Sequence, residues 1–345
     1  MGKYSFLDDY SEGCHPNILN KLIETNLIQQ TAYGFDEYSF KAKELISNKL
    51  NNQESEIFFV TGGTQANLII VSSLLRSHEA IISVDSGHIL GREAGALEAT
   101  GHKIISMSSK QGKLDINLIQ QALDNHSLVP HMVKPKLVYI SNATEIGTIY
   151  TKKELDEISK FCKKNKLYLF LDGARLGAAL CSKYNDLTLE DISSLTDIFT
   201  MGATKNGALF GEAIIINNPN LAEDFNINIK QRGALLAKGR TLGIQFLELF
   251  KDDLYFDLAK TANDFALKIS DTFMQKGYRL LDKTQTNQIF LILPNDLIQK
   301  LEEKFSFYVW EKYDEKHSVV RIVTSWITDK NKINELISEI YTQSY

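Results

Sequence analysis

One lysine, Lys205, stands where its amine could do chemistry. It follows an apolar run with strand character at 198–201, three small residues precede it at 202–204, and Gly207 then forms a turn. Small neighbours at a strand end allow a lysine to be held in a cleft without a clash. A lysine amine that is largely desolvated loses its proton more easily and can attack a carbonyl. Most lysines are solvated surface charges, so Lys205 is a candidate only together with other segments.

A glycine-rich turn at 61–67, with the sequence TGGTQAN, follows one apolar run and opens a helical pattern. The glycines let the backbone approach an anion, and the free N–H groups and positive dipole at a helix start bind phosphate. The hydroxyl of Thr64 can add a hydrogen bond. The pattern is neither GxGxxG nor a P-loop, which argues against a dinucleotide or a nucleoside triphosphate. It predicts a phosphate site, although tight packing of a helix start would explain the same glycines.

Asp172 ends another apolar run and is followed by Gly173, Ala174 and Arg175. Ligands bind at the carboxyl ends of the strands in open parallel sheets. A carboxylate there can keep a pyridinium nitrogen protonated, and a Schiff-base lysine is the other requirement of pyridoxal phosphate (PLP). Arg175 can form a two-pronged pair with a substrate carboxylate. The alternative is an Asp-Gly turn beside a surface arginine.

His88, in the segment DSGHI at 85–89, also follows an apolar run, and its ring could stack on a flat cofactor. A lone histidine is more often structural. The other histidines lack metal-ligand spacing, so the sequence predicts no metal site. The order of phosphate turn, histidine, aspartate and lysine strengthens the case, because all four are predicted at strand carboxyl ends of one sheet.

The elements that must position these residues alternate between strand and helix from residue 56 onward. Continuous apolar strands are expected at 57–60, 80–84, 103–105, 137–140, 167–171, 198–201 and 213–216. This pattern predicts an α/β fold with a mostly parallel sheet that helices cover on both faces. Helices are expected at about 89–99 and, as one long pattern, from about 235 to 265. A smaller α+β unit follows, with strands near 288–293, 305–309 and 319–323 and a helix from 330.

Three regions are therefore predicted. Residues 1–50 are an arm plus a helix that packs with the small domain or a partner subunit, residues 51–245 are a large cofactor-binding domain, and residues 246–345 are a small domain. The 38 Lys and Arg residues stand against 43 Asp and Glu, which disfavours nucleic acid and anionic membrane as partners. Three cysteines without a CxxC pair and the lack of a signal-peptide core predict a cytoplasmic protein.

Together these residues resemble the threonine aldolase branch of the β-eliminating lyases, which are PLP enzymes of the aspartate aminotransferase fold. The resemblance covers nearly the whole chain. It implies a homodimer or homotetramer with active sites shared between subunits, and a small amino acid as substrate. The early segment with Tyr33 resembles a family segment near the site. The stretch from Lys230 to Arg240, with Lys238, resembles one that reaches a neighbouring subunit's site.

The resemblance also implies a role for each site residue. The catalytic residues are Lys205, which forms the Schiff base, His88 and Asp172. The substrate carboxylate would be held by Arg175 and Arg321, and Asp8 and Tyr33 are further substrate contacts. Glu93 falls in the acidic position after the stacking histidine. The cofactor contacts are Gly63, Thr64, Gln65, His88, Asp172, Arg175, Thr204 and Lys205.

Three positions depart from the family pattern. A histidine that assists the substrate hydroxyl appears as Thr144, an early serine appears as Asp8, and the serine before the lysine appears as Thr204. With Thr144 in that place, His88 or a water that it positions becomes the candidate base.

The resemblance predicts PLP-dependent aldol cleavage of a β-hydroxy-α-amino acid, with L-threonine or L-allo-threonine giving glycine and acetaldehyde. The alternatives are a PLP-dependent β-eliminating lyase, an aminotransferase, a non-catalytic PLP-binding protein and, less favoured, a dinucleotide-dependent oxidoreductase.

Overall fold

A computed structural model of the chain describes residues 2–341. Its larger sheet has seven strands in the order β2-β8-β7-β6-β5-β3-β4. Strands β3 to β7 run parallel, and β8 runs antiparallel to both of its neighbours, β7 and β2. The sheet is therefore mostly parallel, as the sequence predicts. Its strands are β2 (Glu56–Val60), β3 (Glu79–Val84), β4 (Lys103–Met107), β5 (Lys134–Ser141), β6 (Tyr168–Asp172), β7 (Ile198–Gly202) and β8 (Glu212–Ile216).

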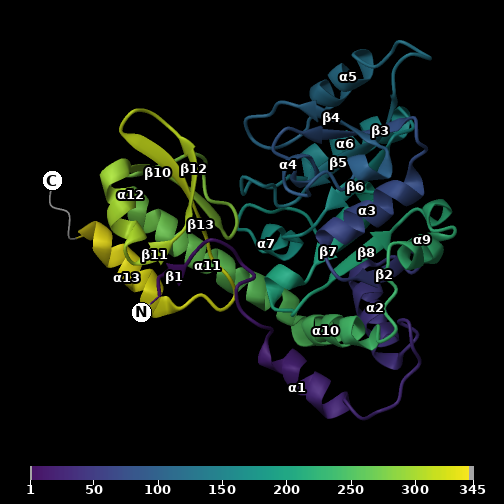
Figure 1. Ribbon diagram of the computed structural model, residues 1–345, viewed down its shortest axis with the longest axis horizontal. Coiled ribbons are helices and arrows are strands. Elements are labelled where there is room, and N and C mark those ends of the chain that lie inside the picture. The colour runs from purple at the N-terminus through teal and green to yellow at the C-terminus, as the bar shows by residue number, and fades with distance from the viewer. Residues whose placement is uncertain (1, 342–345) are drawn as a thin grey trace.

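Helices lie on both sides of this sheet (Figure 1), which explains why its strands are continuously apolar. Every residue of β3, β7 and β8 is buried. Successive residues of β5 pack into different cores, because side chains alternate between the faces of a strand: Val138 and Ile140 lie in one cluster, and Leu137 and Tyr139 lie in the other. The helices are α2 (Glu37–Leu50), α3 (Gly63–Leu74), α4 (His88–Gly91), α5 (Ile116–Asp124), α6 (Lys152–Lys164), α7 (Leu176–Leu180), α8 (Leu189–Leu195), α9 (Phe225–Gln231) and α10 (Arg240–Phe250).

The smaller sheet is antiparallel, with four strands in the order β12-β13-β10-β9. These are β9 (Arg279–Leu280), β10 (Gln288–Pro294), β12 (Tyr308–Lys312) and β13 (His317–Val323). Helices α11 (Leu254–Gln275), α12 (Asn295–Glu302) and α13 (Lys330–Tyr341) complete this α+β unit, which lies beside the larger one (Figure 1). The strand expected at 305–309 is divided into β11 (Phe305–Ser306) and β12.

Two predicted helices are shorter than the sequence pattern suggests. The pattern from 235 to 265 is broken at Asp252 and Asp253, whose φ angles of 56° and 60° end α10 and start α11 in a new direction. Near residue 95 the φ angles of Ala94 (52°) and Gly95 (74°) likewise stop α4 after one turn. Residues in the left-handed conformation interrupt the hydrogen bonds of a helix. The spacing of apolar residues in the sequence does not indicate where such residues occur.

The first 50 residues do not behave as one unit. Strand β1 (Tyr4–Ser5) pairs with β11, and Phe6 lies in the core of the small unit. By contrast, α1 (Pro16–Thr25) and α2 pack beside α10, and Ile18 and Ile46 join the core of the large sheet. The N-terminal arm therefore contacts both units, and the proposed domain boundaries stay a prediction. Within residues 2–341, the helices fall short of the length and apolarity that crossing a membrane requires.

Candidate active site

The predicted residues meet at the carboxyl edge of the large sheet. There they surround a cavity of about 310 Å³, within the range of ~300–1,000 Å³ that is usual for small-ligand sites. The antiparallel strand β8 begins at this same edge, because its register places Glu212 opposite both Val60 and Gly202. The residues that line the cavity include Gly63, Thr64, His88, Asp172, Arg175, Thr204 and Lys205.

Two glycines bring the ends of β6 and β7 close enough to set Lys205 beside Asp172. A Cβ atom on Gly173 would lie 1.9 Å from the carbonyl oxygen of Thr200, and one on Gly202 would lie 2.4 Å from that of Ala174. Contacts this short exclude any larger side chain. The glycine in the Asp-Gly-Ala sequence at the end of β6 is therefore required for steric reasons, in addition to the chemical role predicted for the aspartate.

The glycine-rich turn forms the uncapped start of α3. No side chain caps this N-terminus, and the space into which a Cβ of Gly63 would project is open. The free N–H groups of the first turn and the hydroxyl of Thr64 are thus available to an anion. Gln65 takes a different position from the one expected. Its Oε1 accepts hydrogen bonds from the N–H (3.1 Å) and hydroxyl (2.7 Å) of Thr61, which closes the turn.

Asp172 is held by three hydrogen bonds. Its Oδ2 accepts from the hydroxyl of Tyr139 at 2.5 Å and from Nδ2 of Asn67 at 3.4 Å, and its Oδ1 accepts from the N–H of Ala174 at 2.9 Å. Burial, with the nearby Asp172 charge, raises the pKa of Tyr139 well above its usual value, so this phenol stays a donor. The carboxylate orientation is thereby fixed.

Lys205 lines the cavity, and its pKa is lowered, first by burial and then by the positive charge of Arg175. This is the property that the sequence assigned to a nucleophilic amine. Glu212, at the start of β8, is a neighbour that the sequence did not reveal. Burial, together with the charge of Asp172, raises the pKa of Glu212 to about 8, so the group is largely protonated at neutral pH.

His88 begins α4 and is oriented by a buried carboxylate. Its Nδ1 lies 2.8 Å from Oε1 of Glu93, whose side chain is fully buried. The same oxygen accepts from Nδ2 of Asn67 at 2.7 Å. A histidine nitrogen that lies opposite a carboxylate is the protonated one, so Nδ1 carries the proton. The other ring nitrogen, Nε2, remains as the second polar atom of the ring. Asn67 therefore links the histidine to Asp172.

Arg175 pairs within the protein, with Asp9 of the N-terminal arm. Its Nε and Nη2 donate to the two oxygens of Asp9 at 2.7 and 2.9 Å, and Asn287 donates to Asp9 at 2.8 Å. Burial alone would raise the pKa of Asp9, but the guanidinium outweighs it and holds this pKa below its usual value. Asp8, the predicted substrate contact, is not among the described residues that line this cavity or the adjoining one that Arg321 lines. It accepts hydrogen bonds from Tyr10 and Ser11 instead.

A second cavity, of about 720 Å³, adjoins the first and opens toward the small unit. Arg321 on β13 lines it, and its guanidinium lies over the rings of Tyr308 (4.8 Å) and Trp310 (5.3 Å). Its Nη2 donates to the carbonyl oxygen of Leu7 at 3.1 Å. Arg175 and Arg321 thus approach the two adjoining cavities from different units of the chain, and their role as a carboxylate clamp stays a prediction.

Two predicted positions lie elsewhere. Tyr33 lines a separate cavity beside α2 and α9, so a role at the active site requires a second subunit. Thr144 is fully buried and bonds to Thr148 inside its own loop, whereas its neighbour Glu145 lines both cavities. Thr144, which stands at the position of the expected histidine, therefore does not line the cavities, and the next residue, Glu145, does. Its position just after the strand at 137–140 was the available signal.

Comparison with known proteins shows to which family the chain belongs. Residues 8–295 match the model of the beta-eliminating lyases. This chain belongs to the beta-eliminating lyase family. Within the family it belongs to the threonine aldolase branch, because it is 32% identical to a low specificity L-threonine aldolase of Pseudomonas aeruginosa, over 96% of this chain and 95% of that protein.

Solved structures agree with this placement. The Leishmania major threonine aldolase superposes with a TM-score of 0.96 at 46% identity, covering 98% of this chain and 99% of that one. The aspartate aminotransferase of Thermus thermophilus has a TM-score of 0.70 at 11% identity, covering 99% of this chain and 91% of that one, which confirms the fold.

The residues of the site fit PLP, the cofactor of this lyase family. The uncapped start of α3 suits its phosphate, and Asp172 suits its ring nitrogen. Buried polar atoms without a partner in the described chain also gather around the cavity, among them Oδ1 of Asn67, Oε2 of Glu93 and Oε1 of Glu212. Such atoms are rare in folded proteins unless a ligand or water meets them.

Proposed function

We propose that this lyase catalyses PLP-dependent aldol cleavage of a β-hydroxy-α-amino acid, with L-threonine or L-allo-threonine giving glycine and acetaldehyde. The observation that carries the proposal is the meeting of Lys205, Asp172 and the phosphate turn around one cavity, in a chain 32% identical to an L-threonine aldolase. When bound, PLP supplies an electron-accepting ring conjugated to the substrate nitrogen.

Each residue then has a defined task. The start of α3 at Gly63 and Thr64 binds the phosphate, Asp172 holds the proton on the ring nitrogen, and His88 covers the ring. Lys205, with its lowered pKa, provides an unprotonated amine for the cofactor aldehyde. This arrangement leaves the carboxylate of the substrate to the two arginines.

Arg175 and Arg321 orient the substrate through its carboxylate. Such a two-sided clamp would hold the substrate in one orientation at the cofactor and so would select which bond at Cα reacts. Asp9 keeps the guanidinium of Arg175 in one orientation through its two hydrogen bonds. The clamp brings the β-hydroxyl of the substrate to the boundary between the two cavities.

Substitution of Lys205 tests the proposal. Borohydride reduction of the purified protein should trap PLP on the peptide that contains Lys205, and a mass spectrum locates the label. The Lys205→Ala variant should lose both the label and the release of acetaldehyde in a coupled assay. Full aldol cleavage by this variant would refute the proposal. Product analysis with L-threonine, L-allo-threonine, D-threonine and L-serine separates aldol cleavage from β-elimination and transamination.

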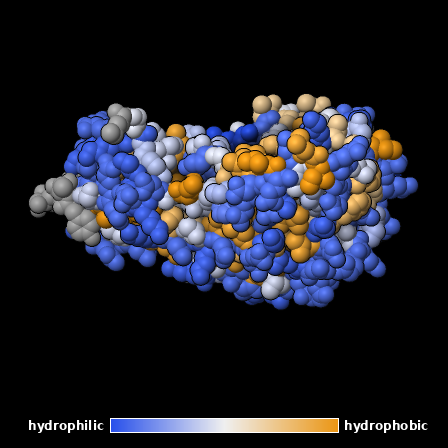
Figure 2. All heavy atoms as spheres, turned by 90° about the horizontal axis from the view of Figure 1, so that it is seen from below, coloured by the Kyte–Doolittle hydropathy of each residue, from blue (hydrophilic) through white to orange (hydrophobic). Residues whose placement is uncertain are grey.

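We also propose that the protein forms a homodimer or homotetramer in the cytoplasm. Large apolar side chains are exposed on α1 and the loop after it, including Ile23 (68%), Leu27 (93%) and Phe35 (58%). Figure 2 views the molecule from the side on which α1 lies and shows hydrophobic residues gathered over the large unit. Monomers rarely leave such patches open. Analytical ultracentrifugation tests this part, and a monomer at micromolar concentration would contradict it.

A further inference from the structure

The two cavities of the site meet at a boundary made of few residues. A substrate whose nitrogen is directed to Lys205 and whose carboxylate lies between Arg175 and Arg321 crosses this boundary, so the bonds that change lie there. Both cavities are lined by the same five side chains: Tyr10, His88, Glu145, Arg175 and Lys205.

Glu145 is the one carboxylate among these five. Its Oε1 accepts hydrogen bonds from the N–H of His88 at 2.9 Å and from the hydroxyl of Ser141 at 2.8 Å. Its Oε2 is shielded from solvent and has no hydrogen-bond partner within the described chain. One oxygen thus anchors the side chain, and the other keeps its lone pairs for a ligand. Buried carboxylate oxygens are seldom left without a partner unless they have a function.

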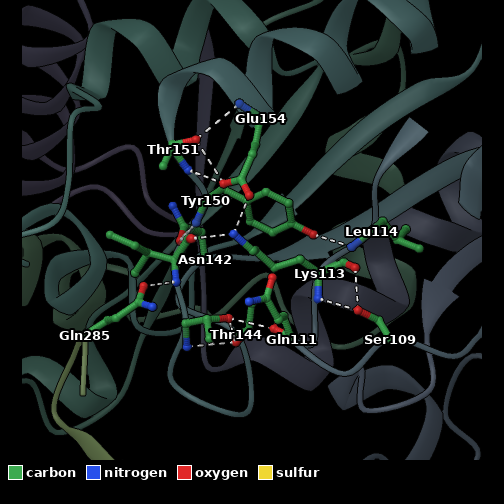
Figure 3. Close-up of polar contacts among 12 residues, drawn as sticks. Ser109, Gln111, Lys113, Leu114, Asn142, Thr144, Tyr150, Thr151, Glu154 and Gln285 are labelled. Atoms are coloured by element: carbon green, nitrogen blue, oxygen red, sulfur yellow. Dashed lines mark hydrogen bonds and ion pairs between the residues drawn. The ribbon is translucent and has the colours of Figure 1, made fainter. Parts of the chain in front are cut away.

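The loop that carries Glu145 is fixed from both units of the protein (Figure 3). Asn142 accepts from the N–H of Tyr150 at 3.2 Å. Gln285, from the segment before β10, accepts from the N–H of Ile149 at 3.0 Å. Gln288, on β10 itself, donates to the carbonyl oxygen of Thr144 at 3.1 Å.

Further bonds within the loop complete this support. The hydroxyls of Thr144 and Thr148 lie 2.7 Å apart, and that of Thr148 donates to the carbonyl oxygen of Gln111 at 2.8 Å. Figure 3 shows Thr144 and Gln111 within this network. A catalytic side chain needs such support, because small misplacements cost much of the rate.

We infer that Glu145 is the general base that takes the proton of the substrate β-hydroxyl, a role that rests on the proposed aldol cleavage. The hydroxyl O–H bond breaks, and its proton binds to the Glu145 carboxylate. The electron pair of that bond becomes the C=O π bond of acetaldehyde as the Cα–Cβ bond breaks. The Cα–Cβ pair remains with Cα, where a proton added later completes glycine. His88, oriented by Glu93, then covers the cofactor and is not the base.

The surroundings of Glu145 increase its strength as a base. Burial raises its pKa, as does the charge of Asp172, and these effects outweigh its hydrogen bonds. A raised pKa increases the proton affinity of the ionised carboxylate, and base efficiency is highest when the pKa lies near the working pH. The titratable and charged groups around Glu145 are Tyr10, His88, Tyr139, Tyr150, Asp172, Arg175 and Lys205.

Glu145→Gln tests the inference, because it keeps the shape of the side chain and removes its basicity. Two reactions are compared in the PLP-loaded enzyme: acetaldehyde release from L-threonine, and exchange of the α-proton of glycine in D₂O by NMR. Glycine has no β-hydroxyl, so its exchange needs Lys205 and the arginines without this base. We expect cleavage to fall by about 10²–10⁴-fold, the usual worth of a general base, while exchange continues. Glu315→Gln on the exposed surface is the matched control.

The outcomes are distinct. In the unmodified enzyme kcat for cleavage should fall as the pH drops through the pKa of Glu145, and formate should restore part of the cleavage in Glu145→Ala. Unchanged cleavage in Glu145→Gln overturns the inference, and selective loss of cleavage in His88→Asn would then assign the base to His88. An equal fall of exchange and cleavage reduces Glu145 to a structural role. If the unmodified enzyme gives neither reaction, the proposed function itself fails.

Discussion

At the scale of single residues, the site combines charges that would repel one another if all were ionised. Asp172, Glu212 and Glu145 border the cavity of Lys205, and each of the last two has a raised pKa for the same reason, burial near Asp172. Asp172 itself is surrounded by the donors of Tyr139, Asn67 and Ala174. Donors to both of its oxygens orient the Asp172 carboxylate, whereas Glu145 is anchored through Oε1 alone and Oε1 of Glu212 has no partner in the described chain.

The raised pKa of Glu212 predicts a pH-dependent stability. Between the ordinary carboxyl pKa of 4.5 and about 8, the folded chain holds a proton that the unfolded chain has released. Stability contributed by this group therefore decreases as the pH rises through this window. In Glu212→Gln the decrease should be smaller, measured as the free energy of unfolding in urea at pH about 5 and about 8.

The substitution removes the titration of Glu212 together with its coupling to Lys205. The lowered pKa of Lys205 gives a slope of the opposite sign, and the Glu212 charge acts to raise this pKa. The facing groups Asp172 and Tyr255 are kept in both proteins. Parallel stability profiles for the two proteins would show that Glu212 is ionised in the folded chain, contrary to this prediction.

At the scale of elements, the spacing between β6 and β7 is set by Gly173. Replacing it with alanine would force a Cβ against the carbonyl oxygen of Thr200, at 1.9 Å. We expect Gly173→Ala to destabilise the fold by about 1–3 kcal/mol or more, as overpacking does, and to weaken PLP binding by displacing Asp172. Urea unfolding and a PLP titration by absorbance measure the two effects. Gly13→Ala, where a Cβ meets nothing within 4 Å, is the control and should leave both values unchanged.

The sequence predicted elements well where one physical pattern dominated. The central strands β6 and β7 are mostly buried apolar runs, Asp172 ends the first and Lys205 follows the second, so their meeting at one edge could be inferred. Helix breaks at Asp252 and Asp253 were missed, because aspartate in a left-handed conformation leaves no apolar signature.

The sequence also did not reveal the side chains that bond to Asp172 from the middle of other elements. Tyr139 lies inside β5, and Asn67 lies inside α3, so both read as ordinary sheet and helix residues. Their hydrogen bonds to Asp172 depend on side-chain directions in three dimensions. The resemblance placed Asp8 at the position of the early serine, whereas Arg175 pairs with the next residue, Asp9. Neighbouring residues of an extended arm point in different directions, and sequence alone does not say which one faces Arg175.

At the scale of the whole molecule, the N-terminal arm connects the two sheets at the substrate clamp. Strand β1 is paired with β11 of the small unit, and the carbonyl oxygen of Phe6 accepts from the N–H of Val323 at 3.0 Å. Directly after Phe6, the carbonyl oxygen of Leu7 accepts from Arg321, and the carboxylate of Asp9 accepts from Arg175. Each arginine is thus held by the arm, which contacts both units where the two arginines line the adjoining cavities.

Asp9 should therefore matter to both stability and substrate affinity. In Asp9→Asn the charge of Arg175 loses its buried partner, and breaking such a pair costs about 3–5 kcal/mol. The freed guanidinium also loses its orientation, so KM for L-threonine should rise more than kcat falls. Urea unfolding and steady-state kinetics measure the two effects. Asp8→Asn is the matched control, because Asp8 is only half-buried and bonds to Tyr10 and Ser11. If the two variants were equally active and equally stable, the arm would have no part in the clamp.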